Sequence, residues 1–234
     1  MFGEQGILGC ISPSTIQIPS ELDELLPPGM GVVATVLDVR AHTDEQFRAA
    51  RQKLAGAVDA VVGEGAQAVW IDGVPVAVWD GYQAEQDMLG ELSSHCGVPV
   101  TTGVSSAVEG LRHLGVQRLI AATAYIPEVN ERVGRYFGQA GFELLAIEGL
   151  AVRSPAENAR LSGDAYADLA RKLFAAHPQA DGFFLGGRGN LMPTAAAVER
   201  ELGKPVVMGR QASLWWVLRA IGRDFGRGRL LASL

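Results

Sequence analysis

The sequence predicts an α/β fold in which doubly wound parallel sheets form two similar lobes with a cleft between them. Short strand-like runs alternate with helix-like segments almost throughout the chain, which implies right-handed crossovers between parallel strands. Most of these runs are continuously apolar, as is typical of strands covered on both faces. Similar openings of strand and loop occur at Ile7 and Arg118. We therefore expect a first lobe at residues 1–110, to which 211–234 return, and a second lobe at residues 111–210.

Apolar runs and helix-end signals define the expected elements. Eight strands are expected, at Ile7–Ser12, Gly31–Val39, Ala68–Ile71, Pro99–Thr102, Arg118–Thr123, Glu143–Ile147, Gly182–Leu185 and Pro205–Met208. Thr43 and Gln46 have the spacing of a capping box, and the helix that follows carries an apolar face from Phe47 to Val61. Further helices are expected at about 105–114 before Gly115, from Pro127 to Gly141, at about 193–202 before Gly203, and from about 211.

Composition excludes several classes of protein. The 234 residues are 48% hydrophobic and carry a net charge of −6 without a block of like charges, which argues against nucleic acid and anionic membranes as partners. The chain has no apolar run of roughly 20 residues and no secretory signal, so we expect a cytoplasmic protein. Only two cysteines occur, Cys10 and Cys96, and no His or Cys pair has metal-ligand spacing. No metal and no cofactor are expected, because dinucleotide and P-loop motifs are also missing.

The loops after the first two strands carry candidate ligand-binding groups, because ligands of such sheets bind beyond the carboxyl ends of the strands. At Ser12 and Pro13, a hydroxyl group and free amides can bind a carboxylate, or the segment is simply a capped turn. Arg40 and His42 place a cation and an imidazole before a helix. The ordinary pKa of histidine, about 6.5, suits His42 to act as a general acid or base. The alternative is a solvated loop.

Three later loops also carry candidates. Asp72 follows a strand directly and can accept a proton there, although an aspartate at a strand end is also a common turn former. Tyr125 can hydrogen-bond a carboxylate or a developing enolate, or it can be a packing residue. The backbone amides of the glycine-rich loop 186–190 can bind a small anion, and Arg188 adds a cation to this loop.

Several segments resemble a known family. The stretch AATAYIPEVNER at 121–132 closely resembles arylmalonate decarboxylases, as do GVPVTT at 97–102 and the GLR and LGV that follow it. RQASLW at 210–215 and the later Leu218-Arg219 resemble the last helix of maleate cis-trans isomerases. The resemblance covers about residues 6–222 and implies membership of the aspartate/glutamate racemase superfamily. It implies two pseudo-symmetric Rossmann-like lobes around a cleft and cofactor-free chemistry beside a carboxylate.

The sequence departs from the family pattern at its reactive positions. The family's two strand-end cysteines fall on Gly73 and Gly187, and the hydroxyl pair that follows the first is replaced by Val74 and Pro75. Tyr125 matches the family, as does Asn130. At positions that line an apolar pocket in the decarboxylases, this chain has His42 and Asn158, and Arg188 enters the second cysteine's loop. The resemblance therefore implies a more polar pocket that accepts a polar or anionic ligand.

Two functional hypotheses remain open from the sequence. The first is an isomerase or decarboxylase-like lyase that acts on a small carboxylic acid through an enolate- or carbanion-like state. The second is a pseudoenzyme that binds a small acid without chemistry. A homodimer is also expected, since the adjacent Trp215 and Trp216 cannot both point inward from one helix. The expected catalytic residues are Asp72, His42, Tyr125 and Arg188, and the expected substrate-binding residues are Ser12, Pro13, Arg40, Gly73, Val74, Asn130, Asn158, Gly187, Gly189 and Asn190.

Overall fold

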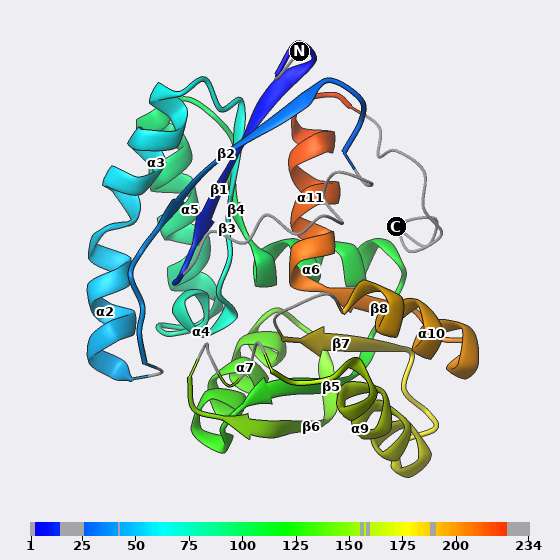
Figure 1. Ribbon diagram of the computed structural model, residues 1–234. Helices are drawn as coiled ribbons and strands as arrows, with labels where there is room; N and C mark the ends of the chain where they lie inside the picture. The colour runs from blue at the N-terminus through cyan, green and yellow to red at the C-terminus, as the bar shows by residue number, and fades with distance from the viewer. Residues whose placement is uncertain are drawn as a thin grey trace.

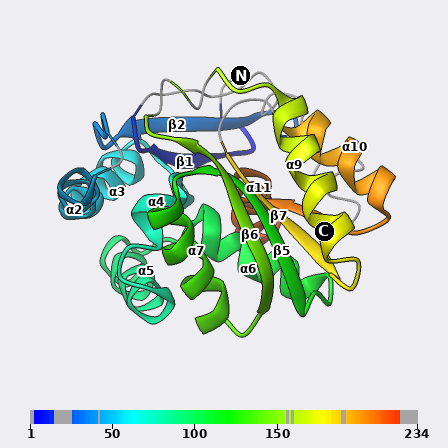
Figure 2. The same ribbon diagram turned by 90° about the horizontal axis from the view of Figure 1, so that it is seen from below.

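Two four-stranded parallel sheets, flanked by helices, form the protein (Figures 1 and 2). The computed structural model describes residues 3–14, 26–41, 43–154, 157, 160–187 and 191–223. The strand orders are β2-β1-β3-β4 and β6-β5-β7-β8, so the first strand of each sheet lies between the second and the third. This arrangement confirms the predicted α/β class and its two similar sheets.

Seven strands match the predicted runs to within three residues at each end, whereas β6 extends from the predicted end at Ile147 to Val152. The strands are β1 (Gly6–Ser12), β2 (Met30–Val36), β3 (Ala68–Ile71), β4 (Val100–Thr102), β5 (Arg118–Tyr125), β6 (Glu143–Val152), β7 (Gly182–Gly186) and β8 (Val206–Met208). Every residue of β3, β4, β7 and β8 is buried, because helices cover both faces of these inner and edge strands.

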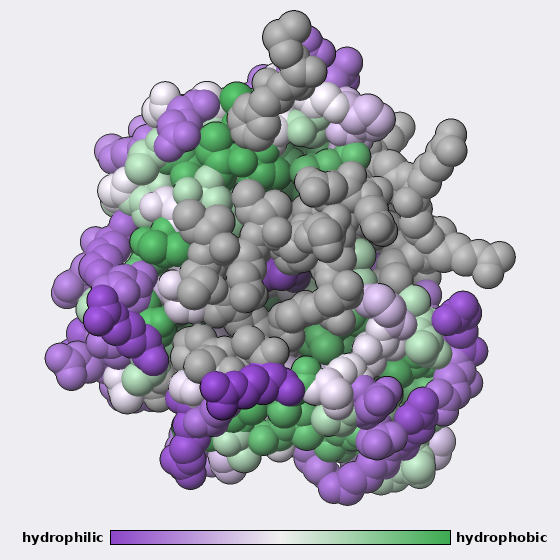
Figure 3. All heavy atoms as spheres, viewed as in Figure 1, coloured by the Kyte–Doolittle hydropathy of each residue, from purple (hydrophilic) through white to green (hydrophobic). Residues whose placement is uncertain are grey.

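The helices lie between the strands in chain order. They are α2 (Asp44–Gln52), α3 (Leu54–Gly63), α4 (Val74–Ala77), α5 (Tyr82–Cys96), α6 (Gly103–His113), α7 (Pro127–Gln139), α9 (Gly163–Ala176), α10 (Met192–Leu202) and α11 (Gly209–Ala220). Among the described residues, no helix combines the length and the apolar character needed to cross a membrane. On the face seen in Figure 3, hydrophilic side chains gather along the outer margins of the molecule.

The prediction of the first helix is wrong in two details. The apolar face from Phe47 to Val61 belongs to two helices, which are separated at Lys53, whose amino group donates to the Leu37 carbonyl at 3.2 Å. Thr43 caps α2 as expected, since its Oγ1 accepts from the Gln46 amide at 3.3 Å. The Gln46 side chain does not complete a capping box, because its oxygen accepts from the Arg40 amide instead, at 3.1 Å.

The two lobes exchange a helix. α6 follows β4 of the first sheet, yet its apolar side chains belong to the core around the second sheet. α11 follows β8 of the second sheet, and its Leu214 and Trp215 pack with Leu8 and Trp70 of the first sheet, whereas Trp216 is only partly buried. The boundary expected at residue 110 therefore falls inside α6. Whether the partly exposed Trp216 supports a homodimer stays a prediction.

Candidate functional site

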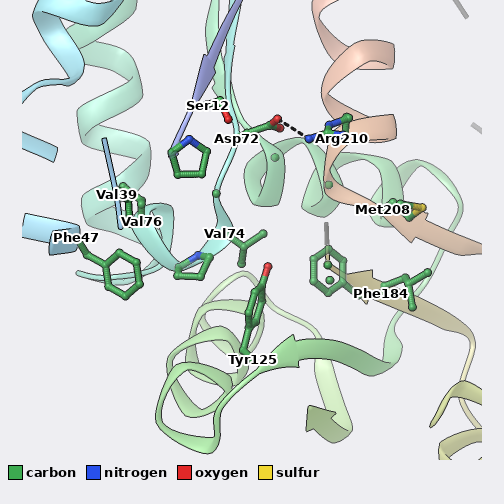
Figure 4. A pocket seen from close by; sticks show the side chains of 18 of the residues that line it. Ser12, Val39, Phe47, Asp72, Val74, Val76, Tyr125, Phe184, Met208 and Arg210 are labelled. Atoms are coloured by element: carbon green, nitrogen blue, oxygen red, sulfur yellow. Dashed lines mark hydrogen bonds and ion pairs between the residues drawn. The ribbon is translucent and has the colours of Figure 1, made fainter. Parts of the chain in front are cut away.

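A cavity lies where the carboxyl ends of the two sheets face each other (Figure 4). It encloses about 970 Å³ of empty space, including space open to solvent. The loops after β1, β3, β5, β7 and β8 supply its walls, as expected at the topological switch points of doubly wound sheets. Its described lining consists of Ser12, Pro13, Val39, Phe47, Asp72, Gly73, Val74, Pro75, Val76, Gly103, Tyr125, Phe184, Leu185, Gly186, Gly187, Met192, Met208, Gly209 and Arg210.

The first-lobe wall is built on the ends of β1 and β3. The carbonyls of Ser12 and Pro13 accept hydrogen bonds from the Leu37 amide at 3.0 Å and the Val39 amide at 2.7 Å, which tie this wall to the end of β2. The Asp72 amide donates to the Ile11 carbonyl at 2.8 Å. These backbone bonds continue the parallel ladder past the strand ends and fix where the side chains enter the cavity.

Gly73 follows Asp72 and is the N-cap of the short helix α4, which lies within a segment that the sequence predicts to be a loop. Its φ of +100° lies in a region that residues with a Cβ rarely adopt. A Cβ at this position would also lie 3.1 Å from the Pro13 side chain. The backbone itself therefore favours glycine here.

Asp72 forms an ion pair with Arg210 in the cavity. Arg210 Nη2 donates to Asp72 Oδ2 at 3.1 Å, and the two side chains are 18% and 12% exposed respectively. Figure 4 shows the two side chains pointing toward each other, one from the end of β3 and the other from the start of α11. The pair joins the two halves of the site and places a carboxylate and a cation side by side.

Tyr125 brings a phenol into the cavity from the second lobe, with its hydroxyl directed toward the first-lobe wall (Figure 4). Burial raises the pKa of Tyr125, and the nearby Tyr166 and Asp72 raise it further. The phenol therefore keeps its proton at neutral pH, which suits it to donate a hydrogen bond to an oxyanion rather than to act as a base.

Asn130 is linked to Tyr125 through the Thr123 hydroxyl. The Thr123 hydroxyl donates to Asn130 Oδ1 at 2.6 Å and accepts from the Tyr125 amide at 3.1 Å. Asn130 is buried and is not among the described residues that line the cavity. The structure thus gives it a positioning contact, and its predicted contact with substrate stays a prediction.

Only some of the other predicted site residues line the cavity. Ser12, Pro13, Val74 and Gly187 line the cavity as expected. Arg40 does not, because its side chain is exposed and pairs with Asp38 at 3.0 Å. The predicted residues His42, Asn158, Arg188, Gly189 and Asn190 lie outside the described residues.

Apolar side chains form most of the described wall. Valines, prolines and Phe47 line the first-lobe side, and Phe184, Met192 and Met208 line the second-lobe side. The polar side chains of this described wall are those of Ser12, Asp72, Tyr125 and Arg210. The prediction of a polar pocket rests on His42, Asn158 and Arg188, which lie outside the described residues, and it stays a prediction.

Neither cysteine lines the cavity. Cys10 is buried on β1 among apolar residues, and burial, together with the charge of Asp72, raises the pKa of its thiol well above the ordinary value. Cys96 ends α5 and donates to the Val98 carbonyl at 3.6 Å. Within the part of the chain that the structure describes, no group of three or more His, Cys, Asp or Glu side chains is arranged to hold a metal ion.

Arg210 was not expected among the site residues. It lies 138 positions from Asp72 in the chain, and only the return of α11 to the first lobe brings the two together. Arg210 begins the segment RQASLW, which resembles maleate isomerases, and its position just after β8 is the sequence signal that points to the cavity.

Sequence and structure comparisons agree on the relatives of this chain. The family model described as arylmalonate decarboxylase matches residues 8–231. The chain is 28% identical over 216 residues to arylmalonate decarboxylase from Bordetella bronchiseptica, covering 92% of this chain and 90% of that one. It is 29% identical over 135 residues to maleate isomerase from Nocardia farcinica (strain IFM 10152), covering 56% and 54% of the two chains.

Solved structures of these relatives share the whole architecture. A liganded double mutant of arylmalonate decarboxylase superposes with a TM-score of 0.86 at 27% identity, covering 92% of each chain. The N. farcinica maleate cis-trans isomerase bound to TRIS superposes with a TM-score of 0.84 at 19% identity, covering 93% of this chain and 92% of that one, which shows the common fold. The chain belongs to the arylmalonate decarboxylase family, in the branch of the aspartate/glutamate racemase superfamily that also includes maleate isomerase.

Proposed function

We propose that this protein is a cofactor-independent isomerase or decarboxylase-like lyase that acts on a small carboxylic acid through an enolate- or carbanion-like intermediate. Oxygen and nitrogen groups, rather than thiols, handle the protons. The observation that carries the proposal is the composition of the cavity: the Tyr125 hydroxyl and the Asp72–Arg210 pair face one space that neither cysteine lines.

Tyr125 supplies the electrophilic part of this chemistry. Removing a proton or carbon dioxide next to a carboxylate places negative charge on the carboxylate oxygens. A protonated phenol in a largely apolar cavity stabilises such an oxyanion more strongly than water does, because its dipole is already oriented.

Asp72 and Arg210 supply the charged part. The guanidinium group can bind a substrate carboxylate through two parallel hydrogen bonds, and the Asp72 carboxylate beside it can accept a proton. His42 remains a further candidate for proton transfer from its sequence position.

The cavity lining, which includes neither cysteine, supports a reaction that differs from that of a relative in using no thiol. One solved maleate cis-trans isomerase carries a covalently bound succinylcysteine intermediate. One arylmalonate decarboxylase variant replaces a glycine by cysteine and a cysteine by serine. By the family resemblance, the corresponding positions here are Gly73 and Gly187, and both line the cavity. The proposed reaction therefore proceeds without a covalent thiol adduct.

A protein that binds a small acid without chemistry is the alternative. It is favoured by the ion pair itself, since Asp72 already has a partner in Arg210 and neither glycine offers a group that can transfer a proton. In this case the cavity binds an acid, and the acid remains unchanged over long incubation.

The decisive experiment incubates the protein with malonate, phenylmalonate, succinate and maleate in D2O. Proton NMR then follows decarboxylation, isomerisation and deuterium uptake at the α-carbon, while thermal shift measures binding. The proposal predicts turnover of at least one acid, and binding without any change supports the pseudoenzyme.

Three variants assign the roles once turnover is found. Tyr125→Phe is expected to lower kcat about 100-fold, the usual effect of removing one oxyanion donor. Asp72→Asn and His42→Ala are expected to abolish turnover while the acid still raises Tm, and full activity in both would exclude the proposed proton transfer. Tyr82→Phe is the matched control, because the Tyr82 hydroxyl accepts from Arg112 and does not line the cavity.

A further inference from the structure

The pairing of β5 with β6 is irregular just before Tyr125 enters the cavity. Thr123 of β5 pairs with Gly149 of β6. The next pair joins Tyr125 to Val152, so β6 advances three residues where β5 advances two. The extra length includes Ala151, whose φ of +56° is uncommon for a residue with a Cβ. Such a β-bulge bends the strands locally and changes the direction of the side chains beside it, which here include the phenol of Tyr125.

Gly149 leaves the room that this bend needs. A Cβ built on Gly149 would collide with the Tyr125 carbonyl oxygen. It would also lie 2.5 Å from Asn130 Nδ2 and 3.0 Å from Thr123 Oγ1. Gly149 is not among the glycines with a positive φ, so close approach rather than backbone conformation favours glycine here. The backbone of Tyr125 therefore occupies the space that a side chain on β6 would fill.

Thr123 holds the bend through its hydroxyl group. Its Oγ1 accepts from the Tyr125 amide at 3.1 Å and donates to Asn130 Oδ1 at 2.6 Å, which ties the end of β5 to α7. Its methyl carbon faces the other neighbouring strand, where a Cβ on Gly186 of β7 would lie 3.2 Å away. Thr123 is fully buried, so packing and hydrogen bonds leave its side chain little freedom to move.

We propose that Thr123 is a positioning residue for Tyr125, and that its hydroxyl fixes the direction in which the Tyr125 phenol enters the cavity. Thr123 is not among the described residues that line the cavity, so it acts through Tyr125 rather than on the bound acid. Figure 4 shows the phenol directed from the end of β5 toward the first-lobe wall. This inference rests on the proposed function for the reaction that Tyr125 assists, but the placement of the phenol can be measured without substrate.

Fluorine NMR tests the placement in the free protein. The chain has four tyrosines, so 3-fluorotyrosine gives four resonances that single Tyr→Phe variants assign. Thr123→Val has a similar shape but no hydroxyl, and it is expected to move or broaden the Tyr125 resonance. Thr123→Ser loses the methyl group but keeps the hydroxyl, and it is expected to leave that resonance nearer its wild-type position. Thr101→Val is the matched control, because Thr101 is also a buried strand residue, with its hydroxyl 2.8 Å from that of Ser106.

A double-mutant cycle tests whether Thr123 acts through the phenol. With an acid that the protein turns over, Thr123→Val is expected to lower kcat about 10-fold, since misplacement of a catalytic group by about 1 Å can cost about 100-fold. In the Tyr125→Phe background the same change is expected to lower kcat less than about 2-fold, because the hydroxyl that it misplaces is already gone. Thr123→Ser is expected to keep most of the wild-type kcat. A merely structural role would lower kcat equally in both backgrounds.

The outcomes separate this inference from the proposed function. An unmoved Tyr125 resonance in Thr123→Val, or equal movement in Thr123→Val and Thr123→Ser, would overturn the role of Thr123 whether or not any acid is turned over. Equal losses of kcat in the two backgrounds would also overturn it and would leave the proposed function intact. If no acid is turned over, the proposed function fails and the fluorine result decides the inference.

Gly149→Ala provides a second variant if Thr123→Val does not fold. It keeps the Thr123 hydroxyl but places a methyl group against the Tyr125 carbonyl from β6. It is expected to move the Tyr125 resonance and to lower kcat, and an unmoved resonance would show that the bend does not direct the phenol.

Discussion

Replacing Arg210 by methionine should destabilise the protein more than any comparable change at the surface. The variant leaves the Asp72 carboxylate in a site where its side chain is only 12% exposed, without the guanidinium 3.1 Å away. Loss of one partner from a fully buried pair costs about 3 to 5 kcal/mol. Because both side chains retain some contact with solvent, we expect about 2 to 4 kcal/mol, or a fall in Tm of about 5 to 12 °C.

Thermal and urea unfolding measure this loss against a matched control. Arg171→Met removes a cation that pairs with Glu201 at 2.8 Å, but those side chains are 46% and 45% exposed, so the expected loss of stability is much smaller. Adding Asp72→Asn to Arg210→Met should recover part of the stability, because the unpaired charge is removed. Equal losses in the two Arg→Met variants, or strictly additive effects at Asp72 and Arg210, would refute this account of the pair.

Three further predictions follow from contacts outside the cavity. Burial raises the pKa of the Glu85 carboxyl, to which the Tyr136 hydroxyl donates at 2.6 Å. The contribution of Glu85 to stability is therefore full below its ordinary pKa of 4.5 and is lost as pH rises through the raised value. The urea midpoint of Glu85→Gln should rise relative to that of wild type between pH 4 and pH 7, and a constant difference would contradict the shift. Gly149→Ala should lower Tm by several degrees in differential scanning calorimetry, because its Cβ would collide with a backbone oxygen of β5, and an unchanged Tm would be inconsistent with this packing. Arg132→Met should lower the free energy of unfolding in urea by about 1 to 2 kcal/mol, since the guanidinium lies 3.6 Å from the centre of the Trp79 ring and donates to the Trp79 backbone carbonyl. Arg132→Lys keeps the charge but not the planar group, so it should lose nearly as much stability as Arg132→Met, and a stability equal to wild type would show that charge alone matters.

Much of the fold could be predicted because the strands are continuously apolar and the helices end at clear signals. The predicted bounds of β3 are identical to the observed ones, and Gly115, Gly141 and Gly203 each follow a helix closely, with a positive φ. Helix α5 was not predicted, since Gly81 precedes it and gives no side-chain cap. The break at Lys53 was also missed, because the apolar spacing continues across it.

The site was predicted in part, for a reason of geometry. Residues at or directly after the end of a strand, such as Tyr125 and Asp72, can be assigned to the cavity from their position in the sequence. Arg210 cannot be assigned to the cavity in this way, because its position depends on how α11 crosses back to the first lobe. Arg40 was expected next to a strand end, but β2 already ends at Val36 and the Arg40 side chain turns to Asp38.

The exchange of α6 and α11 between the lobes bears on how the chain unfolds. Neither sheet is fully covered by helices of its own half, and the two helices cross so closely that a Cβ on Gly209 would lie 3.2 Å from the Gly103 carbonyl oxygen. If the chain were cut between the halves, each hydrophobic core would lose the helix that the other half contributes to it. The two halves are therefore expected to melt in a single transition and to be insoluble when produced as separate polypeptides.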